Sequence, residues 1–149
     1  MELTNAYQII LWLHYFVSGT FLFIALWLGV RSVRGLVKEL TYVKLDKILA
    51  YLFIVNLYLQ LLFGLILFTN LSIFGYDYQS ADGSIALASK RLWPVEHIVL
   101  MLFALFIANL GLIFSSKSNI SVTKHRKILI YYSVSIGLIC ISLASIYWL

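Results

Sequence analysis

Four long runs of apolar residues decide the fold class of this chain. They cover approximately residues 7–30, 48–74, 93–114 and 128–149. Each run reaches the roughly 20 residues that a helix needs to cross a hydrocarbon core about 30 Å thick. None of the runs alternates between apolar and polar residues, and a helix satisfies its backbone hydrogen bonds internally. The runs therefore predict an all-α fold, a four-helix transmembrane bundle.

The composition supports one membrane domain. Hydrophobic residues make up 62% of the chain and charged residues 11%, whereas a soluble domain has roughly 25% charged residues. The first run is preceded by the acidic Glu2, and no small-residue cleavage site follows it, so we expect this run to stay in the mature protein. Residues 1–149 are expected to form a single four-span integral membrane domain.

The basic residues predict how the chain is oriented. The first and third loops with their flanks contain nine of them, whereas the middle loop contains only Lys90 and Arg91. The positive-inside rule then places the first and third loops in the cytoplasm. This gives an up-down-up-down bundle with both termini outward. The nine residues are Arg31, Arg34, Lys38, Lys44, Lys47, Lys117, Lys124, Arg126 and Lys127.

Several other features have simple interpretations. The net charge of +5 indicates attraction to anionic lipid rather than to nucleic acid. The single cysteine, Cys140, is expected to pack as a small hydrophobic residue. The segment 124–127, Lys-His-Arg-Lys, is expected to be solvated or to contact headgroups. Residues 75–90 form the one loop long enough to hold structure of its own.

Two histidines lie inside the apolar runs at nearly the same depth. At 1.5 Å per residue, His14 lies about 10 Å below the outer start of its run and His97 about 6 Å below Trp93. An imidazole within the membrane is a functional-site hypothesis by default. A bis-histidine haem takes its ligands from opposing helices, and the first and third helices of such a bundle are diagonal. His125, about 24 Å from that level, is not expected to be a co-ligand.

Small residues follow each histidine at helical spacing. They leave room for a flat macrocycle, although small residues also simply let membrane helices approach one another. Met101, one turn after His97, is a further candidate near the iron. We therefore predict that His14 and His97 ligate the metal of a haem, with Ser18, Met101 and Ala104 lining it. The small residues are Ser18, Ala25 and Gly29 in the first run, and Ala104, Ala108 and Gly111 in the third.

Other interpretations of the two histidines stay open. They can hydrogen-bond neighbouring helices, or serve other proton or metal chemistry. Zinc is disfavoured because it requires three or four protein ligands, and Glu96 is the only further candidate ligand near the depth of the two histidines. Glu96 itself is expected at a second helix or at the outer interface. On the second helix, Asn56, Gln60 and Gly64 share one face and are expected to point inward and join helices.

Four short segments carry a resemblance to a known family. Leu13-His14, residues 58–65 (Tyr-Leu-Gln-Leu-Leu-Phe-Gly-Leu), Val95-Glu96-His97 and residues 124–127 resemble small four-helix bacterial membrane proteins labelled cytochrome b-like. That family commonly has a histidine at the place of Tyr58, and its absence leaves His14 and His97 as the only level pair. The Leu-His opening is also similar to a four-helix family associated with protoporphyrinogen oxidation.

The resemblance implies a b-type cytochrome in a bacterial inner membrane. Its cofactor would be haem b, and its chemistry electron transfer rather than that of a stand-alone enzyme, with no catalytic side chain. The expected partners are membrane lipid and either quinol or a larger respiratory complex, with no nucleic acid. Two alternatives remain, a non-redox accessory subunit of a membrane complex and a membrane enzyme that oxidises protoporphyrinogen.

Overall fold

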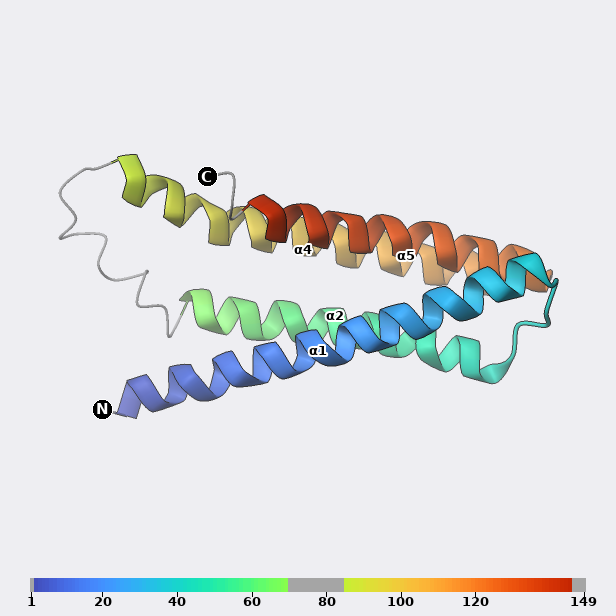
Figure 1. Cartoon of the computed structure of the whole chain (residues 1–149), viewed down its shortest axis with the longest axis horizontal. Helices are drawn as coiled ribbons and strands as arrows, with labels where there is room; N and C mark the ends of the chain where they lie inside the picture. The colour runs from blue at the N-terminus through green and yellow to red at the C-terminus, as the bar shows by residue number, and fades with distance from the viewer. Residues whose placement is uncertain (1, 70–84, 146–149) are drawn as a thin grey trace.

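The computed structural model contains four long α-helices (Figure 1). They are α1 (Glu2–Val37), α2 (Lys44–Thr69), α4 (Ile85–Ser116) and α5 (Ser121–Ala144). The structure describes residues 2–69 and 85–145, with side chains for residues 6–68 and 95–145, and within these ranges it contains no strand. Each helix includes a stretch of at least 22 residues apolar enough to cross a membrane. The prediction of an all-helical chain with four candidate spans is confirmed.

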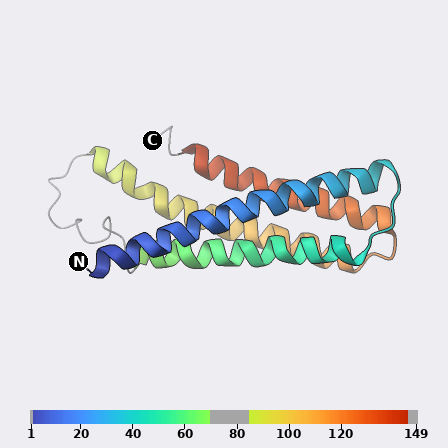
Figure 2. The same cartoon turned by 60° about the horizontal axis from the view of Figure 1, so that its bottom comes forward.

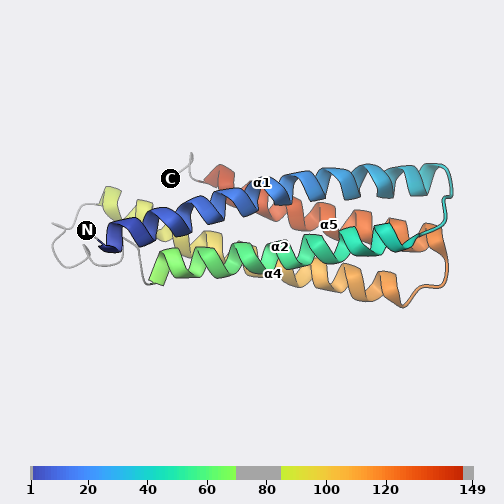
Figure 3. The ribbon, with the colours of Figure 1, turned by 90° about the horizontal axis from the view of Figure 1, so that it is seen from below.

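The helices form a bundle in which each contacts two neighbours. α1 packs against α2 and α5, and α4 packs against the same two helices, so α1 and α4 lie diagonally (Figures 2 and 3). The connections 38–43 and 117–120 lie together at one end of the bundle, which we call the hairpin end. The start of α1 and the last turns of α5 lie at the opposite end, which we call the terminal end.

The helices extend beyond the apolar runs. α1 continues past residue 30 to Val37, and α5 begins at Ser121 rather than at residue 128. Apolar runs mark the stretch in hydrocarbon, whereas Arg and Lys are good helix formers that continue a helix into polar surroundings. α1 ends where Glu39 takes a left-handed φ of 50° and the Leu40 N–H donates to the Gly35 carbonyl.

The third predicted boundary was also displaced. The sequence assigned residues 75–90 to a loop, but residues 85–90 form the first turns of α4. Residues 75–84 lie outside the described part of the chain, as do the last residues of the second and fourth runs. Hydropathy does not separate these residues from a loop, because they precede the continuous apolar run and include Ser89 and Lys90.

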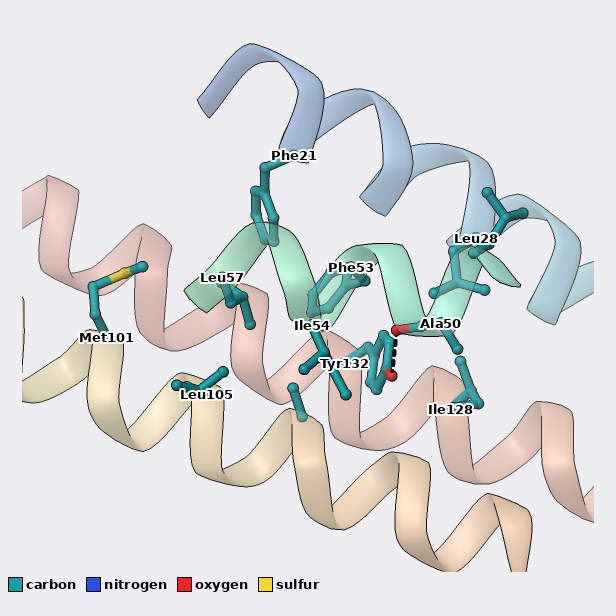
Figure 4. Close-up of a cluster of buried hydrophobic side chains, with 12 residues drawn as sticks. Phe21, Leu28, Ala50, Phe53, Ile54, Leu57, Met101, Leu105, Ile128 and Tyr132 are labelled. Carbon is teal, nitrogen blue, oxygen red and sulfur yellow. Dashed lines mark hydrogen bonds between the residues drawn. The ribbon is translucent and has the colours of Figure 1, made fainter. Parts of the chain in front are cut away.

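The core lies midway along the bundle and joins all four helices (Figure 4). Phe53 of α2 lies between Phe21 of α1 and Tyr132 of α5, with ring centroids 4.8 and 4.3 Å apart. The Tyr132 hydroxyl donates a 3.0 Å hydrogen bond to the Ala50 carbonyl. This bond gives the buried hydroxyl a hydrogen-bond partner while the Tyr132 ring stays within the apolar cluster.

The outer surface of the bundle is strongly apolar. Phe16, Leu26, Phe106 and Ile141 are among many large side chains exposed on it. A contiguous apolar surface of this kind is found where a protein meets lipid or a partner. Cys140 is also exposed, so it belongs to this apolar outer surface rather than to the core.

Candidate cofactor site

His14 and His97 come together at the terminal end. They belong to the diagonal helices α1 and α4, and the two imidazoles are close enough to interact electrostatically. Both side chains are partly buried within the bundle. Helical rise predicted that His14 and His97 share one depth in the membrane, and in the structure the two residues are also near each other.

The His97 ring is oriented by α5. Its Nδ1 atom lies 2.7 Å from the Ser142 hydroxyl oxygen, and Ser142 is completely buried. A hydrogen bond at one imidazole nitrogen fixes the direction in which the other nitrogen points. Sequence analysis did not assign Ser142 to the site, and the available signal was the spacing of Ser135 and Ser142, which places both serines on one face of the helix.

The His14 ring has unused hydrogen-bonding capacity. Its Nδ1 atom is buried and has no hydrogen-bond partner within the described residues. Gly64 of α2 faces this ring, because a Cβ atom at Gly64 would lie 3.8 Å from His14 Cε1. A buried polar atom without a partner costs about 1–3 kcal/mol, so such an atom is a candidate for ligand binding.

A hydrogen-bonded chain from α2 supports the turn of α1 that follows His14. The Gln60 amide donates to the Ser18 hydroxyl at 2.8 Å, and Ser18 donates to the His14 carbonyl at 2.8 Å. One turn along, the Asn56 amide donates to Thr20 at 2.9 Å. The prediction that Asn56 and Gln60 face inward is confirmed, and Ser18 takes part in this contact between helices.

The small residues of α4 serve close packing against α5. The Ala104 carbonyl accepts a 2.8 Å hydrogen bond from Ser135, and both residues are completely buried. A Cβ atom at Gly111 would collide with the Tyr131 side chain. Met101 is buried in the core beside Leu105. The helix-approach interpretation therefore accounts for Ala104 and Gly111.

The small residues of α1 border little free space. Ala25 and Gly29 line a cavity of about 20 Å³. A volume of this size is enough for a water molecule and far too small for a macrocycle. Ala25 and Gly29 therefore do not border space for a flat cofactor.

The remaining predicted residues do not join the histidine pair. Glu96, directly before His97, and Tyr58 are both exposed. His125 lies at the hairpin end, where it packs against Gly35 and Tyr42. Because the His125 side chain is only 2% exposed, the expectation that residues 124–127 are all solvated was wrong. The ring lies on the bundle side of α5, a direction that a charged four-residue segment does not reveal.

His14 and His97 are the candidate metal donors among the described residues at the terminal end. Within the described ranges there is no group of three or more His, Cys, Asp or Glu side chains that could hold a metal ion. Two imidazoles match the axial ligand set of a haem, whose macrocycle supplies the other four donors. Comparisons with protein-family models, curated proteins and solved structures give no match to this chain.

Proposed function

We propose that this protein binds one haem b at the terminal end and transfers electrons. The observation that carries the proposal is the placement of His14 and His97 at the same end of two diagonal helices, with a buried nitrogen of His14 left without a partner among the described residues. A bound haem would supply reversible one-electron chemistry, tuned by its two axial imidazoles and by the apolar surroundings.

The chain's own residues would position the ligands. Ser142 restrains the His97 ring through its contact with Nδ1, as partners of metal-bound histidines do. Gln60 and Ser18 stabilise the turn of α1 that carries His14. We propose Met101 and Ser18 as neighbours of the cofactor, whereas the predicted third neighbour, Ala104, packs against Ser135 of α5.

The membrane arrangement is also part of the proposal. With the hairpin end in the cytoplasm, the bundle is up-down-up-down, both termini face outward and the haem lies in the outer leaflet of a bacterial inner membrane. The nine-to-two distribution of basic residues supports this orientation. Quinol or a larger respiratory complex would then exchange electrons from the outer side.

An absorption spectrum of the purified, reduced protein tests the haem proposal. The wild-type protein should show a Soret band and split α and β bands. His14→Ala and His97→Ala should each abolish this low-spin spectrum or convert it, because each removes one axial bond. His125→Asn is the matched control, since it removes the third imidazole at the opposite end. An unchanged bis-imidazole spectrum in both alanine variants contradicts the assignment.

The close packing of α4 on α5 favours a second candidate, a non-redox accessory subunit. In that case Ala104 and Gly111 only bring helices together, and the exposed apolar faces bind another membrane protein. The protein purified alone would then be colourless. A protoporphyrinogen-oxidising enzyme is distinguished from both by turnover of protoporphyrinogen.

A further inference from the structure

A polar cavity lies at the hairpin end, far from the histidine pair. Its volume is about 120 Å³, and it lies where α1 ends, α2 begins and α5 passes alongside. A cavity of this size has room for several water molecules, and therefore for a small polyatomic ion. We call it the hairpin-end pocket; it is lined by Arg31, Arg34, Leu40, Thr41, Asp46 and His125.

His125 gives the pocket a buried imidazole. Only 2% of the side chain is exposed, and its ring lies beside the Leu40 and Thr41 backbone without a hydrogen bond of ordinary geometry in the described part of the chain. The ring is held from two sides, by Gly35 and by an edge contact with Tyr42 at a centroid distance of 5.0 Å. A ligand in the pocket would be a further hydrogen-bond partner for this imidazole.

The carboxylate in the pocket is already satisfied. Asp46 is 1% exposed, pairs with the Arg31 guanidinium and accepts a 2.9 Å hydrogen bond from the Val43 N–H. Nearby, burial and the charge of Asp46 raise the pKa of Tyr42 to about 12, so its hydroxyl stays neutral. Asp46 therefore compensates Arg31 and leaves the second arginine of the pocket without a counter-charge.

Arg34 supplies the excess positive charge. Its side chain lies at the exposed rim of the pocket and forms no ion pair with any described residue. Two guanidinium groups against one carboxylate give the lining a net positive charge even when His125 is neutral. This charge disfavours a metal cation and favours an anion that accepts several hydrogen bonds.

We propose that the hairpin-end pocket binds a phosphate group, with Arg34, Thr41 and His125 donating to its oxygens. Phosphate oxygens match the planar donor fork of arginine, and a phosphate has enough acceptors to satisfy the imidazole as well. The group can be free phosphate or the phosphomonoester headgroup of an anionic lipid. Basic pockets between membrane helices at the cytoplasmic level bind headgroups in this way. The proposal does not depend on haem binding.

Titration of the delipidated, detergent-solubilised protein tests the pocket. Inorganic phosphate is added first and binding is measured by calorimetry and by the shift of thermal unfolding. The same thermal measurement is then made in nanodiscs of phosphatidylcholine with and without phosphatidic acid. Saturable binding of inorganic phosphate supports the proposal with free phosphate as a ligand. A response to phosphatidic acid alone supports it with a lipid headgroup as the ligand, and no response to either overturns it.

A matched pair of charge variants locates the binding. Arg34→Gln removes a lining guanidinium, whereas Arg126→Gln removes an exposed one from α5 near the same end and outside the lining. We expect Arg34→Gln to weaken phosphate or phosphatidic acid binding by roughly tenfold, the usual effect of losing a charged hydrogen-bond donor. Arg126→Gln should change binding by less than about twofold. If both variants weakened phosphate or phosphatidic acid binding equally, the proposed site would be wrong, and general electrostatic attraction would explain the binding.

Discussion

At the scale of single residues, close contacts between a ring and a glycine determine the geometry of the hairpin end. Gly35 has no Cβ atom, and the His125 ring occupies the space that a Cβ atom would need. His125 is consequently buried against α1 and reaches the pocket lining. Arg31 and Asp46 join α1 to α2 at the same level.

Gly35→Ala should destabilise the protein by about 1–3 kcal/mol, because the new methyl group displaces the His125 ring from a filled interior. Unfolding in detergent measures the effect. Gly19→Ala, also within α1, is the control, since a Cβ atom there meets nothing within 4 Å. That variant should be neutral or gain up to about 1 kcal/mol from helix propensity. Equal destabilisation of both variants would contradict the close contact.

Asp46→Asn should also destabilise the protein, by about 2 kcal/mol, because the charged hydrogen bonds from Arg31 and the Val43 N–H are weakened together. Glu39→Gln, at an exposed position in the connection just before α2, removes one acidic charge without such partners and should change stability by less than about 0.5 kcal/mol. Chemical unfolding of the two variants side by side distinguishes a paired carboxylate from a general charge effect.

At the scale of helices, polar side chains set which faces meet. Asn56 and Gln60 lie one turn apart on α2 and bind Thr20 and Ser18 of α1. On the other side of the bundle, Ser135 of α5 binds the Ala104 carbonyl of α4. These bonds fix the rotation of each helix about its axis. Apolar side chains specify this rotation poorly, because they pack equally well against lipid and against a neighbouring helix.

Gln60→Leu should weaken the contact between α1 and α2 by about 1 kcal/mol, the usual size of a hydrogen bond between membrane helices. Val55→Leu is the control on the same helix, because it introduces the same residue on the exposed face. Thermal unfolding of the detergent-solubilised variants measures the difference. A loss in Val55→Leu as large as that in Gln60→Leu would argue against the assigned face.

The sequence predicts those features that depend on neighbouring residues, and it does not predict those that depend on contacts between distant segments. Hydropathy is local, so the four helices were identified, whereas their polar ends at Val37 and Ser121 were not. Helical rise gave the shared level of His14 and His97. Which side of α5 carries Ser142 and His125 depends on a helix rotation of 100° per residue, set by contacts with distant segments. The partner of His97 and the hairpin-end pocket were therefore missed.

At the scale of the whole molecule, charge is concentrated at one end. The two short connections and the helix ends beside them carry nine basic residues, and the opposite end is dominated by apolar helix surface. Such a distribution resists transfer of the hairpin end across a membrane. The orientation of the bundle in the membrane follows from this asymmetry as a prediction.

Single-cysteine labelling in intact cells tests the orientation, with Cys140 first replaced by Ser. A membrane-impermeant reagent should label Ser80→Cys from outside and should not label Ser118→Cys, which lies in the connection before α5. Permeabilised cells should show labelling at both positions. The reverse pattern would place the terminal end, and with it the histidine pair, on the cytoplasmic side.

Most of the hydrogen bonds between helices lie within two halves of the bundle. Gln60 with Ser18 and Asp46 with Arg31 act within α1 and α2, while Ser135 with the Ala104 carbonyl and Ser142 with His97 act within α4 and α5. Bonds from Tyr132 to the Ala50 carbonyl and from Asn109 to Tyr58 cross between the halves. Each half nevertheless has hydrogen bonds of its own, and the first half is synthesised before the second. Both candidate sites draw on both halves. Neither site exists in a newly made half, so ligand capture would mark the moment at which biogenesis is complete.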